Sequence, residues 1–530
     1  MAGIRRSRGA SPRARGSLCA LGCLTSVLLL AQAYAGPLAA PLADVPSITP
    51  SNLPRIGKID ERFQSYNIEM VEITGGRFWK PYRSQPATQP TPSPRSGPDT
   101  LPAADSNLFQ YRSPIDLTEP RLRKLAAALA PAYLRVSGTW ANSTYFSDSD
   151  DVPSAPPAGF NGVLTSRQWR SVVDFAQSVD ARIVTSFAIS VGTRNVAGDW
   201  KPDQAKRFVS FTRSIGGKIA AAEFMNEPDL AAIGGAPAGY DAAAYGRDFK
   251  IFEAFLKQAS PETMMLGPGT IGQTALASDL FAAVAGADLD AVSYHYYGAL
   301  SERCRGNHMP EAALSEDWLE GTDRALAFYR DLRDRLKPGK PIWLTETAEA
   351  ACGGNPWASS FLDTFRYLDQ LGRLAKAGVQ VVMHNTLAAS DYGLLDERTL
   401  EPRPNYWGAL LWRQLMGTTV LDAGLPIQLG LHVYAHCQRD RPGGVTLLVI
   451  NTDRGTPHAL VLPTASELYT LDAVNLLDTR VRVNGNTLAL GAGDTLPSIA
   501  GAPTPAGPVT FAPATITFVV VPGAANNACR

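Results

Sequence analysis

Residues 221–230 read AAEFMNEPDL and join a run of small apolar side chains to the adjacent polar residues Asn226 and Glu227. An apolar run of this kind is typical of a strand that is buried on both faces. Carboxylates are almost never buried without a partner or a chemical task. We therefore expect Asn226 and Glu227 to end a buried strand and to serve a functional site. Glu223, at even spacing on the same side of that strand, is expected deeper, paired with a basic residue.

Short apolar runs alternate with longer helical patterns from about residue 115 to residue 410. In the helical segments, such as 166–179 and 323–336, apolar residues recur three and four positions apart. This alternation predicts a parallel sheet, and the number of repeats fits an eight-stranded (β/α)8 TIM barrel. The runs expected to be strands are AYLRVSG (132–138), RIVTSFAIS (182–190), IAAAEFMNE (219–227), TMMLGPG (263–269), AVSYHYY (291–297), PIWLTET (341–347) and VQVVMHN (379–385).

The pattern changes after about residue 415 to short β-rich runs separated by turn residues, which predicts a C-terminal β-sandwich. A chain of 530 residues is also longer than one core supports, because single cores stop growing at roughly 250 to 300 residues. We expect a barrel over 60–412 and a sandwich over 413–530, to which a strand from 45–62 could add. The Pro-rich segment 80–106 has no apolar periodicity. It is either a flexible loop or an extended arm near the site.

The first 35 residues have the features of an export signal. Five arginines precede the apolar stretch CALGCLTSVLLLAQ (19–32), and Ala33-Tyr34-Ala35 has the small-x-small pattern of a cleavage site. The apolar stretch is shorter than the roughly 20 residues of a spanning helix, although an uncleaved anchor stays open as the alternative. We expect a secreted or periplasmic protein with no stable membrane insertion after signal removal.

Removal of residues 1–35 leaves 44 basic and 49 acidic residues, a formal net charge of −5. The whole protein is therefore not a polyanion-binding surface, and we expect no nucleic-acid partner. Neither clustered metal-ligand spacing nor a phosphate-binding loop is present, so we expect no metal and no cofactor. The oligomeric state cannot be read from the sequence.

Four cysteines remain after signal removal: Cys304, Cys352, Cys437 and Cys529. In an oxidising compartment an even set of this kind suggests two disulfides. Proximity along the chain and the domain division favour Cys304 with Cys352 and Cys437 with Cys529, although sequence cannot prove that pairing.

Polar residues end three of the predicted barrel strands. One strand ends in Asn226 and Glu227, and a second carries Glu346. A third carries His295, Tyr296 and Tyr297, which we expect to line the site. Catalytic groups of such barrels lie at the C-terminal ends of the strands. Two carboxylates delivered to one barrel mouth suit a glycosidase, in which one protonates the leaving oxygen and the other attacks or activates water. Each residue alone also has an ordinary structural explanation, such as a loop start for Asn226-Glu227 or a core position for His295.

Several longer stretches of the chain carry a family resemblance. MNEP (225–228) with IWLTET (342–347), AYLRVSGT (132–139), SYHYYG (293–298) and the long run 381–421 together resemble glycoside hydrolase family 79, the heparanase and β-glucuronidase family. The resemblance extends from about residue 63 to residue 529. It implies a barrel with the acid/base on the fourth strand, the nucleophile on the seventh, and a β-sandwich.

The resemblance also implies roles for individual residues. Glu227 matches the acid/base, with Asn226 as its neighbour, and Glu346 matches the nucleophile. We expect apolar surroundings and the nearby charge of Glu346 to raise the pKa of Glu227. Uronate carboxylates are bound in the family by a glycine-rich turn and a tyrosine. The matching residues are Gly353, Gly354 and Tyr392; Glu69 and Thr139 match residues that touch sugar hydroxyls, and His295 with Tyr297 matches the aromatic cluster near the nucleophile.

The chain departs from the family pattern in two places. Cys352 precedes Gly353 and Gly354 where a third glycine is expected, which puts the first backbone contact in doubt. The long excised linker of animal heparanase has no counterpart after the second strand, so a single unprocessed chain is implied. The resulting hypothesis is a secreted retaining hydrolase of β-linked glucuronate in glycans. Cleavage within the glycan chain (endo-action) and cleavage at its end (exo-action) are both open. A neutral-sugar hydrolase such as an arabinofuranosidase, and a non-catalytic carbohydrate-binding relative, are the alternatives.

Overall fold

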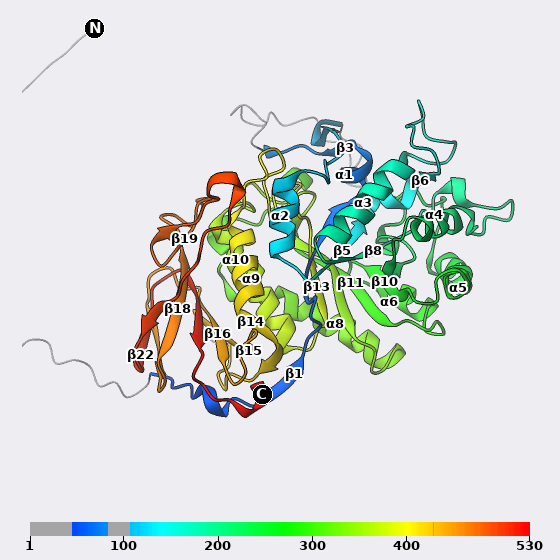
Figure 1. Ribbon diagram of the computed structural model, residues 1–530. Coiled ribbons are helices and arrows are strands. Elements are labelled where there is room, and N and C mark those ends of the chain that lie inside the picture. Colours follow the sequence, from blue (N-terminus) through cyan, green and yellow to red (C-terminus); the bar gives the residue numbers. More distant parts are fainter. Residues whose placement is uncertain (1–44, 83–105, 428) are drawn as a thin grey trace, which may run out of the picture. The chain divides into compact units, whose positions relative to one another are not determined.

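The computed structural model describes residues 45–82, 106–427 and 429–530 (Figure 1). The expected export signal lies outside the described residues, as does most of the Pro-rich segment 80–106. Within the described ranges, we find no helix that combines the length and apolar character needed to cross a membrane.

Eight parallel strands close into a barrel, which confirms the predicted fold class. The ring closes where the last barrel strand pairs with the first, with Val382 opposite Gln64 and His384 opposite Tyr66. Seven of these strands coincide with the predicted apolar runs. In order around the ring, the strands are β2 (Gln64–Glu69), β5 (Ala132–Ser137), β8 (Ala181–Thr185), β9 (Ile219–Glu223), β10 (Met264–Thr270), β11 (Ala291–Leu300), β12 (Ile342–Ala351) and β13 (Val381–His384).

The first barrel strand, β2, was not among the predicted runs. Its sequence QSYNIE alternates polar and apolar residues, yet all six residues are buried. Two of the polar side chains have partners far along the chain: Gln64 donates to the hydroxyl of Tyr367 (2.9 Å) on α9 (Phe361–Lys376), and Asn67 donates to the backbone oxygen of Thr345 (3.2 Å). Because these partners are distant in sequence, the strand does not stand out as an apolar run.

The boundaries of three functional strands differ from those predicted. β9 ends at Glu223, so Asn226 and Glu227 follow the strand instead of ending it. β11 and β12 continue past the predicted ends and stay paired, with Ala299 opposite Ala350. Additional backbone pairing therefore holds the mouth of the barrel on the side of strands six and seven.

Helices follow most of the barrel strands, and one of them, α9, is buried along nearly its whole length. Every residue from Phe361 to Ala375 is buried, because α9 lies between the barrel and a second sheet. The helices are α1 (Met70–Thr74), α2 (Pro120–Ala128), α3 (Ser166–Ser178), α4 (Asp203–Ser214), α5 (Ala242–Ala259), α6 (Ala275–Ala283), α7 (Glu316–Leu319), α8 (Gly321–Leu336), α9 (Phe361–Lys376) and α10 (Pro404–Leu415).

The C-terminal part forms a nine-stranded sheet covered on one face by a two-stranded ribbon. Leu448, Ile450 and Phe518 point from the sheet into the same core as α9 and α10, whereas Leu447 and Val519 pack against the ribbon. The sheet consists of β1 (Arg55–Lys58), β14 (Met416–Leu421), β15 (Leu431–Gln438), β16 (Val445–Asn451), β18 (Ser466–Asp472), β19 (Arg482–Val483), β20 (Asn486–Thr487), β21 (Ala502–Thr504) and β23 (Thr515–Val521), and the ribbon of β17 (His458–Leu462) and β22 (Gly507–Phe511).

Residues 45–530 form one compact unit that contains both the barrel and the sheet. The N-terminal strand β1 pairs with β14, so the 45–62 region contributes to the C-terminal sheet. α10 leads directly into β14, and the proposed boundary at 412/413 lies within the last turn of that helix. The division at 412/413 stays a proposal. Both expected disulfides, Cys304–Cys352 and Cys437–Cys529, are formed.

Candidate active site

The floor of the site is a buried ion pair inside the barrel. Arg135 on β5 lies 2.9 Å from a carboxylate oxygen of Glu223, the last residue of β9. Thr345 donates to the other oxygen of that carboxylate (2.8 Å). Burial acts to raise the pKa of Glu223, but the charge of Arg135, together with hydrogen bonds such as that from Thr345, holds the pKa below its usual value. The expected pairing of Glu223 with a basic residue is thus present, and Arg135 is that residue.

Glu346 reaches the barrel interior through an irregularity in β12. Tyr294 pairs with Leu344 and His295 pairs with Glu346, so Thr345 is an extra residue in the ladder. A bulge of this type re-aims side chains, and here it lets the consecutive residues Thr345 and Glu346 both contact groups inside the barrel. Arg135 bonds one carboxylate oxygen of Glu346 (2.7 Å), and the hydroxyl of Tyr297 donates to the other (2.7 Å).

Glu227 sits on the loop after β9 with a left-handed backbone, at φ 46° and ψ 70°. Such a conformation is rare for a residue with a side chain, and strain of this kind concentrates at functional sites. The preceding residue is fixed on both sides: Asn142 accepts from the backbone N–H of Asn226 (2.9 Å) and donates to its oxygen (2.8 Å). The side-chain oxygen of Asn226 accepts from Arg135 (2.8 Å). The loop therefore presents Glu227 in a defined position.

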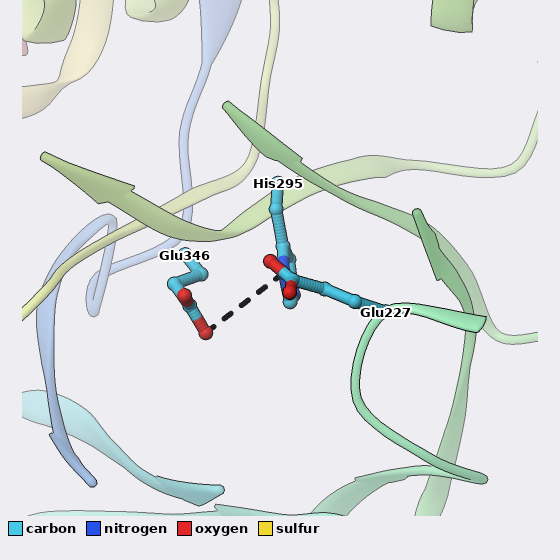
Figure 2. Close-up of side chains that lie close together, drawn as sticks. All are labelled: Glu227, His295 and Glu346. Atoms are coloured by element: carbon cyan, nitrogen blue, oxygen red, sulfur yellow. Dashed lines mark hydrogen bonds and ion pairs between the residues drawn. The ribbon is translucent and has the colours of Figure 1, made fainter. Parts of the chain in front are cut away.

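His295 lies beside Glu227 and Glu346 (Figure 2), and its ring connects Glu227 to Arg135. Its Nε2 lies 3.2 Å from Arg135, and its Nδ1 lies 3.0 Å from Glu227. Burial lowers the pKa of His295, which favours the neutral ring. Because a guanidinium can only donate, Nε2 must accept, and the ring proton must lie on Nδ1, facing Glu227. One oxygen of Glu227 therefore accepts from His295.

The carboxyl of Glu227 is held in its protonated form. Burial is the main reason that its pKa is raised to about 8, and the like charge of Asp229 adds to the effect, while Arg135 opposes it. We expected a raised pKa with Glu346 as the neighbouring charge; the direction agrees, but the nearby charge is that of Asp229. Since His295 donates to one oxygen of Glu227, the carboxyl proton is available on the other oxygen for donation to a ligand.

Glu227, His295 and Glu346 form a tight group in which one ligand atom from each residue lies within 4.8 Å of the other two. The two carboxylates are closer than the roughly 6.5 to 9.5 Å of inverting glycosidases and fit the retaining arrangement of about 5 to 5.5 Å. A His and two Glu are also residue types that ligate metals. The guanidinium of Arg135, in contact with Glu346 and His295, already brings a fixed positive charge to this group, which fits acid–base chemistry.

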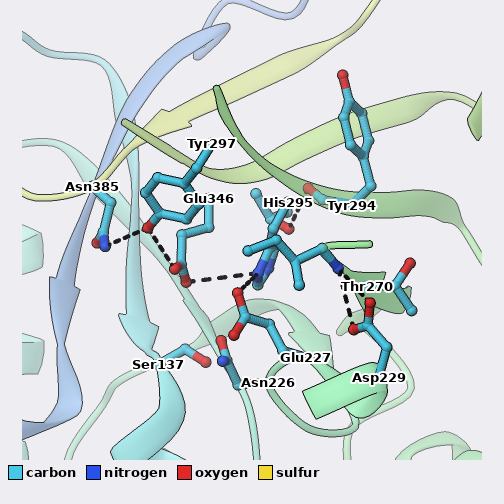
Figure 3. A network of polar contacts seen from close by, with 12 residues as sticks. Ser137, Asn226, Glu227, Asp229, Thr270, Tyr294, His295, Tyr297, Glu346 and Asn385 are labelled. Atoms are coloured by element: carbon cyan, nitrogen blue, oxygen red, sulfur yellow. Dashed lines mark hydrogen bonds and ion pairs between the residues drawn. The ribbon is translucent and has the colours of Figure 1, made fainter. Parts of the chain in front are cut away.

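A second set of polar residues lies beside Glu346, around Asn385 at the end of β13 (Figure 3). The amide of Asn385 donates to Glu69 (3.0 Å) and lies 2.9 Å from the hydroxyl of Tyr297 and 3.2 Å from that of Tyr392. Burial, and then the charge of Glu346, raises the pKa of Glu69 well above its ordinary value. Gly138 leaves the space that this carboxyl occupies, because a Cβ there would lie 1.5 Å from Glu69.

The two glycines expected to bind a carboxylate form a turn after β12, with φ of 80° and 82°. A Cβ on Gly354 would lie 3.1 Å from the ring of Tyr392, and one on Gly353 would lie 2.8 Å from Trp79. The structure thus brings the turn and Tyr392 together. The N–H of Gly354 donates to the oxygen of Ala350 (3.2 Å), which leaves the N–H of Gly353 as the better placed donor for a ligand.

The remaining expected site residues divide between the mouth of the barrel and its outside. Thr139 is half-buried at the start of a short turn after β5, directly beyond Gly138. Tyr296 was also expected to line the site, but its hydroxyl lies against Gly321 at the start of α8. Neighbouring residues on β11 point to opposite faces, which separates Tyr296 from His295 and Tyr297.

Sequence reasoning missed four residues of this site. Arg135 stands in the apolar run AYLRVSG, and a charged residue within a buried strand was a signal that could have identified it. Asn385 ends a predicted strand, and Asp229 follows Glu227 by two residues. Asn142 lies 84 residues before Asn226, and no feature of the sequence connects the two.

Comparison with known proteins agrees with this geometry. Residues 113–372 match the family described as "Glycosyl hydrolase family 79, N-terminal domain". Heparanase of Mus musculus is 29% identical over 479 residues, covering 78% of this chain and 88% of that protein. Hyaluronoglucuronidase of Hirudo nipponia is 25% identical over 489 residues, covering 81% and 95%. A solved 4-O-α-L-rhamnosyl-β-D-glucuronidase of Fusarium oxysporum 12S superimposes with a TM-score of 0.62 at 15% identity, covering 90% and 99%.

A solved arabinofuranosidase superimposes equally well, with a TM-score of 0.62 at 13% identity, so the fold does not distinguish between sugar specificities. The barrel, with two glutamates placed together at one mouth, defines a glycoside hydrolase. The matched residues and the relatives support glycoside hydrolase family 79 for this chain.

Proposed function

We propose that the protein is an exported, retaining glycoside hydrolase that cleaves β-linked glucuronate in glycans. The observation that carries the mechanism is the position of Glu227 and Glu346. One carboxylate oxygen of each lies within 4.8 Å of the other, and both carboxylates lie close to Nδ1 of His295 (Figure 3). The family relatives named heparanase and hyaluronoglucuronidase support the substrate class.

In the first step Glu346 attacks the anomeric carbon while Glu227 protonates the leaving oxygen. Arg135 and Tyr297 each hold one oxygen of Glu346 (2.7 Å), so the nucleophile is fixed before the sugar arrives. His295 keeps one oxygen of Glu227 engaged and leaves the protonated oxygen free. The step forms the glycosyl ester of Glu346 and releases the alcohol of the next sugar.

In the second step Glu227 acts as a base and activates water, which releases glucuronate and restores Glu346. Ester formation consumes the negative charge of Glu346, one of the two carboxylates that neutralise Arg135. The positive charge of Arg135 is then less compensated, and it lowers the pKa of Glu227 further. Arg135 thereby helps to change Glu227 from acid to base between the two steps.

Recognition of the uronate carboxylate is assigned to the N–H of Gly353 and the hydroxyl of Tyr392. The turn and Tyr392 lie in contact, beside Tyr297 and therefore beside the nucleophile. Backbone N–H groups and a hydroxyl can bind an anion without a formal positive charge. A neutral sugar has no carboxylate for these donors, which is the basis for preferring a glucuronidase to an arabinofuranosidase.

Export is proposed from the 1–35 segment and is consistent with the two disulfides, since disulfides persist in oxidising compartments. Mass determination of the mature N-terminus after expression with the native leader tests cleavage after residue 35. An intact N-terminus in a membrane fraction would contradict it.

The substrate class is tested with matched aryl glycosides and with glycan fragments. We expect turnover of an aryl β-glucuronide, much slower turnover of the β-glucoside and none of the α-arabinofuranoside, with β-glucuronate as the first product seen by NMR. Heparan sulfate and hyaluronan fragments then separate chain-internal from terminal cleavage by product size. Preference for the glucoside or the arabinofuranoside would refute the uronate assignment, and an α-configured first product would refute the retaining mechanism.

A further inference from the structure

A short loop at 301–304, directly after β11, contacts the glycine turn that follows β12. Ser301 donates to the backbone oxygen of Cys352 (3.1 Å), and the N–H of Glu302 donates to the side chain of Asn355 (2.9 Å). The disulfide Cys304–Cys352 joins the loop covalently to the residue just before Gly353. The loop therefore holds both ends of the 352–355 turn.

The same loop also reaches the segment that carries Tyr392. Arg303 donates to the carboxylate of Asp391 (2.7 Å), and the N–H of Asp391 donates to the oxygen of Gly353 (3.1 Å). Both side chains of the ion pair are nearly buried, at 6% and 8% exposure. Arg303 further donates to the oxygen of Lys80 (2.7 Å), and its guanidinium lies 3.9 Å from the ring centre of Tyr82. The loop is therefore tied to Asp391, the residue next to Tyr392.

The barrel side of the turn is fixed by a separate contact. Glu349 on β12 accepts from the backbone N–H of Asn355 (2.9 Å) and from its side-chain amide (2.7 Å). The turn is thus attached to β12 through Glu349, and to the Tyr392 segment through Arg303 and Asp391. Asp391 already neutralises the charge of Arg303. The arginine therefore positions the turn and does not offer a free charge to a ligand.

We propose that the 301–304 loop is a specificity-determining element, which fixes the distance between the N–H of Gly353 and the hydroxyl of Tyr392 so that one carboxylate can be bound by both. This inference rests on the proposed glucuronidase function. Hydrogen bonds to an anion weaken steeply as the donor geometry degrades, and a displacement of about 1 Å in a binding group can cost about a hundredfold in rate. Loosening the loop should therefore harm glucuronides much more than the matched glucosides.

The disulfide is tested with the double variant Cys304→Ser/Cys352→Ser. Its matched control is Cys437→Ser/Cys529→Ser, which removes the other disulfide, between β15 and the C-terminal end of the chain. We expect kcat/KM for an activated aryl β-glucuronide to fall about tenfold or more in the first variant, mainly through KM. The kcat/KM for the matched glucoside should change by less than about twofold, because the glucoside has no carboxylate to be bound. The control should lower the melting temperature but keep both kcat/KM values at assay temperatures below it.

Arg303→Met tests the ion pair independently of the disulfide. Arg62→Met is its control, because Arg62 is also a nearly buried arginine and is bonded to Asp180 (2.6 Å). Arg62 precedes β2 and Asp180 precedes β8, so this ion pair lies at the opposite end of the barrel. We expect Arg303→Met to lower the ratio of glucuronide to glucoside turnover about tenfold, and Arg62→Met to leave that ratio unchanged. Thermal unfolding of all four proteins identifies any variant that does not fold.

The outcomes separate the two proposals. A wild type that does not favour the glucuronide refutes the proposed function itself. A wild type that favours the glucuronide, together with folded variants whose substrate ratio stays at the wild-type value, overturns the role of the loop alone. Equal losses on both substrates in folded variants also overturn it, because the loop would then support the barrel mouth as a whole and not the carboxylate subsite.

Discussion

Two of the buried charged groups among the described residues differ in kind: one lies inside the barrel and the other lies between the barrel and the second sheet. In the group between barrel and sheet, Asp369 on α9 accepts from Arg373, His432 and Tyr434, each at 2.6 Å. Glu316 lies 2.9 Å from the far nitrogen of His432. Burial acts against both charges, yet their mutual attraction lowers the pKa of Asp369 to about 2 and raises that of His432 to about 9.

The barrel group has an excess of acids. Glu223, Glu346 and Glu227 share one arginine, Arg135, which contacts the first two. The carboxylate of Glu227 contacts His295, whose pKa is lowered by burial. The consequence is a carboxyl that keeps its proton at neutral pH, with a pKa of about 8.

The difference lies in how completely the charges are matched. A group in which each buried acid contacts a cation has no proton to exchange. Such a group affects the stability of the fold. A group with more acids than cations can keep a proton on one of its acids, and that proton can be donated to a substrate. Substitutions should therefore affect catalysis in the barrel group and stability in the α9 group.

The largest effect is expected for Glu346→Gln. The amide keeps the size of the side chain but cannot form the glycosyl ester, so kcat should fall by about a thousandfold or more. The melting temperature should stay close to that of the wild type. Residual glucuronidase activity within tenfold of the wild type would remove Glu346 from the role of nucleophile.

Glu227→Gln should be less damaging, and its effect should depend on the leaving group. Loss of the acid costs about 10²- to 10⁴-fold on a substrate with a poor leaving group. A dinitrophenyl glycoside needs no protonation in the first step, so the glycosyl-enzyme should form at a near normal rate and be seen as a burst. A uniform loss on both substrates, without a burst, would contradict the acid/base assignment.

Asp369→Asn should have the opposite profile. The change removes the fully buried anion that Arg373 and His432 share and leaves them the more exposed Glu316. Breaking a buried ion pair typically costs about 3 to 5 kcal/mol of unfolding free energy. Denaturant unfolding measures the loss, and kcat/KM at a temperature where the variant is folded should stay near the wild-type value. A folded variant that loses most of its activity would show that the two groups are coupled.

The same group sets part of the pH dependence of stability. His432 has a folded pKa raised from about 6.5 to about 9, so its stabilising contribution is complete below pH 6.5 and is lost as the pH rises through 9. Asp369 has a lowered pKa, so its contribution is present above pH 4 and is lost as the pH falls through about 2. The difference in unfolding free energy between the wild type and Asp369→Asn should accordingly shrink above pH 6.5.

Tyr392→Phe tests the carboxylate subsite itself. It removes one hydrogen bond to a charged group, about 1.5 to 3 kcal/mol, or about ten- to a hundredfold in kcat/KM on glucuronides. The matched glucoside should change much less. If both substrates lose alike and the melting temperature falls, Tyr392 is a packing residue.

The smallest effect is a shift in the pH profile. Since Glu227 is active as an acid while protonated, kcat/KM should decline as the pH rises through about 8. Asp229→Asn removes a like charge from the surroundings of Glu227, so the alkaline decline should move to lower pH. The asparagine oxygen can still accept from the N–H of Gly272, which Asp229 bonds at 2.7 Å. An unchanged alkaline limb would exclude Asp229 as the charge that tunes Glu227.

The sequence predicted the barrel because seven of its strands are apolar runs between amphipathic helices. It missed β2, whose polar side chains are satisfied by residues far along the chain, such as Tyr367. It placed the end of β9 too late, because the apolar pattern continues through Phe224 and Met225 although pairing ends at Glu223. Local periodicity indicates which segments are buried but not where backbone pairing stops.

The two central glutamates could be proposed from the sequence because each follows a run of apolar residues and a family resemblance supports both. The groups that position them could not be identified in the same way. Arg135 contacts four side chains that lie 88 to 211 residues away, so its role depends on closure of the barrel. The bulge at Thr345, which lets Glu346 face inward, also depends on its register with β11.

The burial of α9 has a practical consequence for protein engineering. The sheet residues that pack toward α9 and α10 include Leu448, Ile450 and Phe518, all fully buried. Exposing each such side chain costs roughly 1.5 to 3 kcal/mol, and a few of them equal the roughly 5 to 15 kcal/mol by which a typical protein is stable. A chain truncated after α10 would also expose the apolar face of α9 to water. The catalytic barrel should therefore aggregate when produced alone, and chimeras with related hydrolases should exchange the barrel and sheet together.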